Sequence, residues 1–247
     1  MRITVESKSL APSISATSPC ASTTFDAQCA TTLNQPKIQE LLSRLYTEEK
    51  ETDARTRVKE EALAAAAGGV LDKSTQAALH GSRFLAVAPE VGRLLYLLVR
   101  SRRPALAVEF GASMGISAIH VAAALRDNGH GRLITTEINA EKASRAALHL
   151  EQAGLSDWVD LRQGDAFETL RGVDRIELLL LDGWKPLYLP LLKQLEPSLA
   201  PGCLVIADDT ISLATEMADY LAYVRDSRNG YLSCAIPLDD GLELSIR

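Results

Sequence analysis

The fold is decided by residues 105–118, which read ALAVEFGASMGISA. The first residues of this stretch are an apolar run that predicts a buried strand ending at the acid Glu109. Gly111 and Gly115 then bracket a tight turn, and an amphipathic helical pattern begins at Ile116. Such a turn brings bare backbone N–H groups and a helix N-terminus against a ligand. The stretch therefore predicts the binding centre for a nucleotide-like molecule in an α/β domain.

Strands and helices are predicted to alternate along the chain after this turn. Apolar runs predict further strands at 132–136, 158–161, 176–181 and 203–207. Helical periodicity predicts helices at 115–127, 140–153, 186–199 and 213–228. The last two strands, at 231–236 and 242–246, flank Asp239-Asp240-Gly241 and predict an antiparallel hairpin. The pattern is typical of an α/β fold, a doubly wound and mostly parallel seven-stranded sheet with a C-terminal antiparallel hairpin.

The chain divides into three regions. Residues 1–35 are rich in Ser, Thr and Ala and predict a disordered tail, with a cleaved organelle-targeting peptide as the alternative. Residues 36–83 are predicted to form a helical segment that begins at Pro36, and residues 84–247 the sheet domain. The N-terminal helices either cover a substrate site or form a homodimer contact, and the sequence leaves both open.

Composition narrows the classes of partner. The 247 residues are 47% hydrophobic, which is enough for one sizeable core. A net charge of −6 and a pI near 5.3, without a basic run, argue against a nucleic-acid partner. No run of about 18 apolar residues is present, so we expect no transmembrane helix and no membrane partner. The cysteines lack metal-type spacing and predict buried free thiols in a reducing, cytoplasmic setting: Cys20, Cys29, Cys203 and Cys234.

An acid follows every predicted parallel strand. In open α/β sheets ligands bind outside the carboxyl ends of the strands, so these side chains are expected on one rim. Each acid alone could cap the next helix, but six like charges on one rim repel unless a cation or ligand donors relieve them. The sequence therefore predicts a functional rim made of these acids: Glu109, Glu137, Asp165, Asp182, Asp208 and Asp209.

The spacing of the glycine turn narrows its ligand. Glu109-x-Gly111-x-x-x-Gly115 departs from the G-x-G-x-x-G of a dinucleotide site, and the acid suits an ammonium better than a pyrophosphate. Packing of a helix on a strand is the alternative reason for the two glycines. Glu137 is placed to accept hydrogen bonds from both ribose hydroxyls, or to serve as an N-terminal acid of the next helix. Asp165 lies where an adenine amino group is expected, or caps the short helix after it.

The stretch from Glu109 to Asp165 resembles a class I S-adenosylmethionine-dependent methyltransferase. A second motif, Leu181-Asp182-Gly183-Trp184-Lys185-Pro186-Leu187-Tyr188-Leu189-Pro190 followed by Ala207-Asp208-Asp209, is similar to the catechol O-methyltransferase family and to the metal-dependent group that includes caffeoyl-CoA O-methyltransferases. The resemblance covers residues 84–247 and implies a Rossmann-like methyltransferase fold. It also implies methyl transfer from S-adenosylmethionine to a hydroxyl of a small molecule with adjacent oxygens, catechol-like or caffeoyl-like.

The resemblance implies roles for particular residues. Asp182, Asp208 and Asp209 would be ligands of Mg²⁺ or Mn²⁺, Lys185 the general base, and Trp184 a side chain that packs against the cofactor. Hard oxygen ligands suit these ions independently of the resemblance, and a base lysine needs a lowered pKa. A surface lysine and a core tryptophan are the alternatives. The expected cofactor-binding residues are Val87, Glu109, Gly111, Ser113, Gly115, Ser117, Glu137, Asp165, Asp182 and Trp184.

The chain departs from the family pattern at two positions. Asp209 stands where the family usually has Asn, and Cys234 falls where the animal enzymes carry a carboxylate that grips catechol. The resemblance therefore implies methylation of a metal-chelated hydroxyl for this chain, but it does not imply that catechol is the physiological acceptor. Two other functions stay open, a non-catalytic S-adenosylmethionine-binding protein and an NAD-dependent dehydrogenase. A dehydrogenase has no use for Asp182, Lys185 and Asp208 together, which disfavours it.

Overall fold

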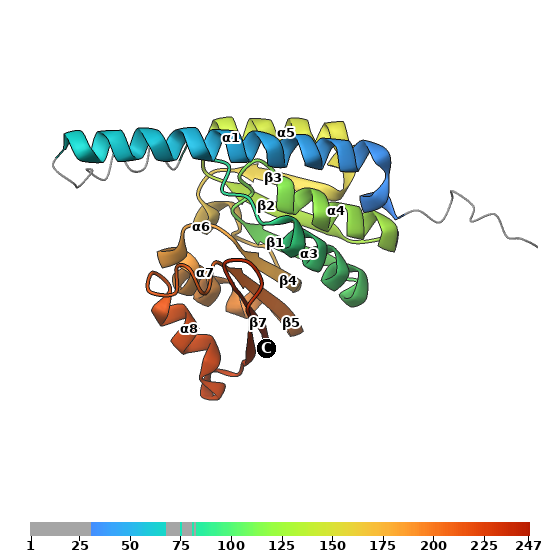
Figure 1. The fold of residues 1–247 in the computed structure, drawn as a ribbon. Helices are drawn as coiled ribbons and strands as arrows, with labels where there is room; N and C mark the ends of the chain where they lie inside the picture. Colours follow the sequence, from blue (N-terminus) through green and yellow to red (C-terminus); the bar gives the residue numbers. More distant parts are fainter. Residues whose placement is uncertain (1–30, 68–74, 76–80, 82) are drawn as a thin grey trace, which may run out of the picture. The chain divides into compact units, whose positions relative to one another are not determined.

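The computed structural model describes residues 31–67, 75, 81 and 83–247. Residues Thr31–Arg247 form one compact unit built around a central sheet (Figure 1). The described residues form a seven-stranded sheet in the order β3-β2-β1-β4-β5-β7-β6. Its strands are β1 (Leu106–Phe110), β2 (Arg132–Glu137), β3 (Val159–Gln163), β4 (Ile176–Leu181), β5 (Leu199–Asp208), β6 (Leu232–Ile236) and β7 (Leu242–Ile246).

The sheet has the predicted mixture of strand directions. Strands β1 to β5 are parallel, and β7 pairs antiparallel with both β5 and β6. Each parallel strand runs toward the same edge, because consecutive strands are joined by a helical crossover. The prediction of a doubly wound, mostly parallel seven-stranded sheet with a terminal hairpin is confirmed.

Helices cover both faces of the sheet (Figure 1). The longer ones are α1 (Pro36–Ala66), α3 (Pro89–Arg102), α4 (Ile116–Asn128), α5 (Ala140–Ala153), α6 (Ala166–Thr169), α7 (Tyr188–Leu195) and α8 (Ala218–Arg225). Short 3-10 helices are η2 (Thr32–Asn34), η3 (Ser156–Trp158), η4 (Lys185–Leu187), η5 (Glu196–Ser198) and η6 (Ser227–Asn229). The buried side chains form two clusters, one beneath α1, α3, α4 and α5 and the other beneath α6, α7 and α8.

Local sequence sets the ends of the helices. Pro89 opens α3 at its first turn, where its missing N–H costs nothing. The Asn139 side chain caps α5 by accepting hydrogen bonds from the Glu141 and Lys142 N–H groups. Gly154 ends the same helix in the left-handed conformation, with φ +69°. These residues fix where α3 begins and where α5 begins and ends.

Two predicted helices are shorter than expected. The segment predicted as a helix over 186–199 divides into η4, α7 and η5, and β5 already begins at Leu199, because Pro197 cannot donate the next helical hydrogen bond. Of the helix predicted over 213–228, only α8 forms. Residues 213–217 form turns, with hydrogen bonds from the Leu213 N–H to the Asp209 carbonyl and from the Glu216 N–H to the Leu213 carbonyl. Just before them, the N–H groups of Ile211 and Ser212 both donate to the carbonyl of Asp240 in the hairpin turn.

The boundary of the predicted tail is also different. Residues 31–35, which we assigned to the tail, belong to the folded unit. Asp127 anchors them, because its carboxylate accepts hydrogen bonds from the N–H and the hydroxyl of the buried Thr32. The rest of the predicted tail lies outside the described residues, and so does the alternative of a targeting peptide.

The prediction of buried thiols is right for one of the two described cysteines. Cys203 is buried in β5, whereas Cys234 is exposed on β6. The second prediction is wrong because β6 is an edge strand of the sheet, with β7 on one side only. Cys20 and Cys29 lie outside the described residues. Every helix of the described part is too short or too polar to span a bilayer.

Candidate active site

Three acids meet where β4 and β5 end. These strands are in register, with Leu181 beside Ala207, so the residues that follow, Asp182 and Asp208, also come side by side. One carboxylate oxygen from each of Asp182, Asp208 and Asp209 lies within 4.8 Å of the other two. The structure thus brings together all three residues predicted as metal ligands.

The backbone at Asp209 helps to aim its carboxylate. Asp209 has φ +62°, in the left-handed region. Apart from glycine, Asp and Asn tolerate this conformation best, because their short polar side chains can bond locally. The turn therefore accommodates either residue, which accounts for an Asp where the related enzymes were expected to have Asn.

Lys185 lies inside this acidic cluster. Its Nζ is 2.7 Å from Asp209 Oδ2 and 3.7 Å from Asp182 Oδ1, and the side chain is 9% exposed. Nζ also donates a hydrogen bond of 2.9 Å to the hydroxyl of Tyr188, which is fully buried. The alternative of a surface lysine is therefore wrong. Tyr188 belongs to the motif that resembles the family, but the sequence assigned it no role; it stands three positions after Lys185, on the first turn of α7.

The charges in the cluster strongly perturb one another. Burial, followed by repulsion from Asp208, raises the pKa of Asp182 well above its ordinary value. Burial and then Asp209 raise the pKa of Asp208 to about 7. Burial pulls the pKa of Lys185 down, but Asp182 and Asp209 outweigh it and the net shift is upward. We expected a lowered pKa for Lys185, and in the protein alone the shift has the opposite sign because the carboxylates surround the ammonium.

The donor set fits a hard divalent cation. When ionised, the three carboxylates carry three negative charges, and Lys185 returns one positive charge. The remaining excess of two charges, on oxygen donors alone, matches Mg²⁺ or Mn²⁺ better than a metal that prefers nitrogen or sulfur. Burial first, and then repulsion between the carboxylates, raises the pKa values of Asp182 and Asp208, and a cation at the cluster would oppose both effects.

The glycine turn packs against β4 and α5. A Cβ on Gly111, where φ is +100°, would lie 2.5 Å from the carbonyl oxygen of Asp182, and one on Gly115 would lie 3.1 Å from the Cβ of Ala146. The turn therefore needs glycine at both positions for packing, the alternative that the sequence left open. The contact also places the turn beside the metal-binding candidate Asp182.

Glu137 holds the other side of the turn. Its carboxylate accepts hydrogen bonds of 2.8 Å from the Ser113 N–H and the Asn139 N–H. Asn139, not Glu137, caps α5. Ser113 has φ +44°, and its bond to Glu137 helps to hold this unfavourable conformation. Glu137 is thus built into the turn.

Glu109 is fully buried at the end of β1. One carboxylate oxygen accepts a hydrogen bond from the Thr135 hydroxyl, and among the described residues the other oxygen, Oε1, completes none. Burial raises the pKa of Glu109 to about 7, against the opposing effect of Ser117 and Thr135. A buried acceptor without a donor is unusual in a folded protein, and it suits a ligand that brings a charged N–H group.

The remaining predicted residues differ in their surroundings. Asp165 is exposed and caps α6 by accepting a hydrogen bond of 2.9 Å from the Phe167 N–H, so the capping alternative is realised. Val87 and Ser117 are buried. Trp184 is 55% exposed, which excludes the alternative of a core tryptophan.

Known proteins share both the sequence pattern and the fold. Residues 108–210 match a family model described as a methyltransferase domain. Catechol O-methyltransferase of Mus musculus is 37% identical over 144 residues, 55% of this chain and 53% of the mouse protein. Catechol O-methyltransferase of Sus scrofa is 33% identical over 151 residues, 58% of this chain and 79% of the pig protein. The chain thus spans about half the length of the mouse relative.

A solved structure agrees with these matches. The O-methyltransferase TomG from Streptomyces achromogenes, solved in complex with SAM, aligns with a TM-score of 0.59 and 26% identity. The alignment covers 66% of this chain and 81% of TomG. The prediction of a Rossmann-like methyltransferase fold is confirmed.

Proposed function

The chain belongs to the class I S-adenosylmethionine-dependent O-methyltransferases, and from this premise we propose that it methylates one hydroxyl of a small molecule with two adjacent oxygens. The observation that carries the proposal is the cluster of Asp182, Asp208 and Asp209 around the Lys185 ammonium. A fold that only binds a cofactor has no need of three acids and a buried lysine at one point, because such a cluster costs stability.

The turn and its neighbours would hold the cofactor. S-adenosylmethionine supplies, when bound, an electrophilic methyl group on a sulfonium. The unpartnered oxygen of Glu109 supports a role as acceptor for an ammonium group, and Glu137 supports one as acceptor for ribose hydroxyls. Both carboxylates lie beside the glycine turn, whose packing on Asp182 joins the cofactor region to the acidic cluster.

The acidic cluster would hold the acceptor through a divalent cation. Asp182, Asp208 and Asp209 would be its protein ligands, with Mg²⁺ or Mn²⁺ as the ions that suit them. Such an ion supplies, when bound, a Lewis acid that favours ionised hydroxyls. The proposal favours vicinal oxygens because two of them can share one ion. It does not favour catechol in particular, since Cys234 is exposed on β6 and offers no carboxylate.

Lys185 would accept the hydroxyl proton at Nζ. The side chain is confined by its contacts with Asp209 and Tyr188, so Nζ stays at the cluster instead of reaching solvent. Neutral lysine is required for this step, and the carboxylates now favour the charged form. A cation shared by the same carboxylates would weaken that preference, because it takes up their negative charge.

A methyl-transfer assay tests the proposal. It uses labelled S-adenosylmethionine with a panel of catechols and caffeoyl-type esters, in the presence of either Mg²⁺ or EDTA. We expect transfer to at least one vicinal diol in Mg²⁺ and none in EDTA. Asp182→Asn should abolish turnover, whereas Asp226→Asn, at an exposed acid outside the cluster, should not. Lys185→Met should lower kcat by about 10²–10⁴-fold with cofactor binding intact.

Two outcomes would contradict parts of the proposal. Transfer that survives EDTA would refute the role of the cation. Cofactor binding without transfer to any diol would favour a non-catalytic S-adenosylmethionine-binding protein.

A further inference from the structure

Phe84 joins the long helix α1 to the glycine turn. Its backbone N–H donates a hydrogen bond of 3.0 Å to Asp53 Oδ1 on α1. Its carbonyl accepts a hydrogen bond from the hydroxyl of Ser113, the residue of the turn with φ +44°. Phe84 thus uses both of its backbone groups to connect α1 to the glycine turn, and Ser113 of that turn lies 29 positions after Phe84 in the sequence.

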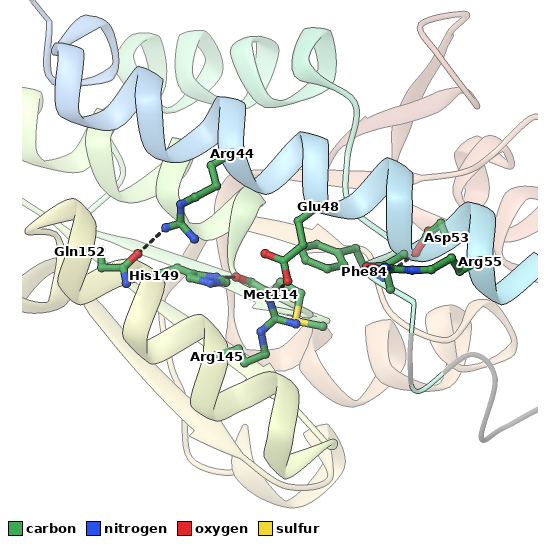
Figure 2. A network of polar contacts seen from close by, with 10 residues as sticks. Arg44, Glu48, Asp53, Arg55, Phe84, Met114, Arg145, His149 and Gln152 are labelled. Atoms are coloured by element: carbon green, nitrogen blue, oxygen red, sulfur yellow. Dashed lines mark hydrogen bonds and ion pairs between the residues drawn. The ribbon is translucent and has the colours of Figure 1, made fainter.

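Helix α5 holds the Phe84 side chain against α1. The Arg145 guanidinium lies 5.0 Å from the centre of the Phe84 ring and pairs with Glu48 Oε1 at 2.5 Å (Figure 2). The ring is fully buried, whereas Arg145 and Glu48 keep about a third of their side-chain surface exposed. We call Glu48, Asp53, Phe84 and Arg145 the Phe84 clasp.

Other hydrogen bonds also hold the turn, among them those from the N–H groups of Gly111 and Ala112 to the Thr136 carbonyl. His149, one helical turn after Arg145, donates a hydrogen bond of 2.8 Å from Nδ1 to the Met114 carbonyl (Figure 2). The Ser113 N–H donates to Glu137. A serine in the left-handed region reverts to a commoner conformation unless its surroundings hold it, and the bond from its hydroxyl to Phe84 is one of the contacts that do.

We propose that Asp53 and Arg145 are positioning residues for the bound cofactor, acting through Phe84 on Ser113. The inference rests on the proposed use of the turn as the S-adenosylmethionine site. The clasp fixes the turn and Glu137 in the arrangement that receives the ligand, so breaking the clasp lowers cofactor affinity. Because the acidic cluster and Lys185 lie outside the clasp, turnover at saturating cofactor is retained.

Calorimetric titration of the full chain with S-adenosylmethionine, together with melting temperatures, tests the proposal. We expect Asp53→Ala to raise Kd about tenfold, which is the value of one hydrogen bond to a charged acceptor. Asp53→Asn keeps an acceptor oxygen and should stay within about twofold of the unmodified protein. Arg145→Met should raise Kd less than Asp53→Ala, because the hydrogen bond from the Phe84 N–H to Asp53 remains. In turnover assays, KM for the cofactor should rise and kcat should not.

Arg44→Met is the matched control. Arg44 also joins α1 to α5, through a hydrogen bond of 2.6 Å to Gln152, but at a distance from Phe84 along both helices (Figure 2). Equal Kd values for Asp53→Ala, Arg145→Met and Arg44→Met would overturn the proposal. An Asp53→Asn variant that binds S-adenosylmethionine as weakly as Asp53→Ala would also overturn it. If Asp53→Ala fails to fold, the Kd of Arg145→Met compared with that of Arg44→Met decides whether the proposal stands. No binding to the unmodified protein would instead overturn the proposed function, and with it this inference.

Discussion

Acidification should destabilise the protein through His120, a buried residue of α4. The ring is 2% exposed and donates a hydrogen bond of 2.9 Å from Nδ1 to the Ile116 carbonyl. It lies against Gly92 of α3, where an added Cβ would be 2.6 Å from the ring. Burial lowers the pKa of His120 from 6.5 to about 4, with Arg93 acting in the same direction.

The sign follows from proton binding in the two states. Below pH 6.5 the unfolded chain takes up a proton at this position, whereas the folded protein does so only near pH 4. The free energy of unfolding therefore falls as the pH drops through this window. At about 1.4 kcal/mol per pH unit the full loss is roughly 3 kcal/mol, of which about 2 kcal/mol is reached at pH 5.

Urea unfolding in EDTA between pH 7.5 and pH 5, with His120→Asn as the comparison, measures this term. The amide can keep the hydrogen bond to Ile116 but takes up no proton, so the stability gap between the two proteins should narrow toward pH 5. Glu49 and Glu109, each with a pKa raised to about 7 by burial, act in the opposite direction but are present in both proteins. His130→Gln, at an exposed position, is the control. A gap that stays constant to within about 0.5 kcal/mol would refute the reasoning.

Three substitutions test other parts of the structure. Gly111→Ala should weaken cofactor binding at least tenfold and cost about 2–4 kcal/mol of stability, while Gly129→Ala, with φ +73° and open space around it, should spare binding in the same titration. Arg225→Ala removes two N–H donors from the buried Glu243 carboxylate and should cost about 2–3 kcal/mol in urea unfolding; a comparable loss in Arg228→Ala, at an exposed pair, would contradict this. Asp208→Asn should raise the melting temperature at pH 8 in EDTA. Burial and Asp209 raise the pKa of Asp208 to about 7, and the amide avoids the cost of a buried charge above that pH. The same variant should abolish Mg²⁺-dependent turnover.

The sheet was predictable because each of its strands has a local signal in the sequence. The run of leucines at 178–181, for example, is buried on both faces of the sheet, as expected of a central strand, and a turn signal follows it. The start of α8 was not predictable in the same way. Turns at residues 213–217 precede it, and they follow the hydrogen bonds from the Ile211 and Ser212 N–H groups to the Asp240 carbonyl, which depend on where the hairpin folds back. The exposure of Cys234 likewise depends on which strand is the last in the sheet.

The site was predictable in its position but not in its contacts. The rule that ligands bind at the carboxyl ends of parallel strands selected Asp182, Asp208 and Asp209, which the structure brings together. The same rule included Asp165, whose carboxylate caps α6; its contact with the adenine of a cofactor stays a prediction. Tyr188 lies within the quoted motif, but nothing in the motif indicated its hydrogen bond with Lys185. The contacts of the Phe84 clasp left no signal in the sequence, because side-chain packing between elements sets them.

The acidic cluster and Lys185 are best understood as one device. Two buried acids with raised pKa values cost stability that apolar residues of similar size would not. Lys185 reduces that cost in the protein alone, since its ammonium touches both Asp182 and Asp209. In the proposed function, a divalent cation held by the same carboxylates would supply the counter-charge in place of the Lys185 ammonium, and Lys185 could then lose its proton and serve as the proposed base. On that proposal the raised pKa of Lys185 is compatible with a role as base, because the protonation of Lys185 would depend on occupancy of the cation site.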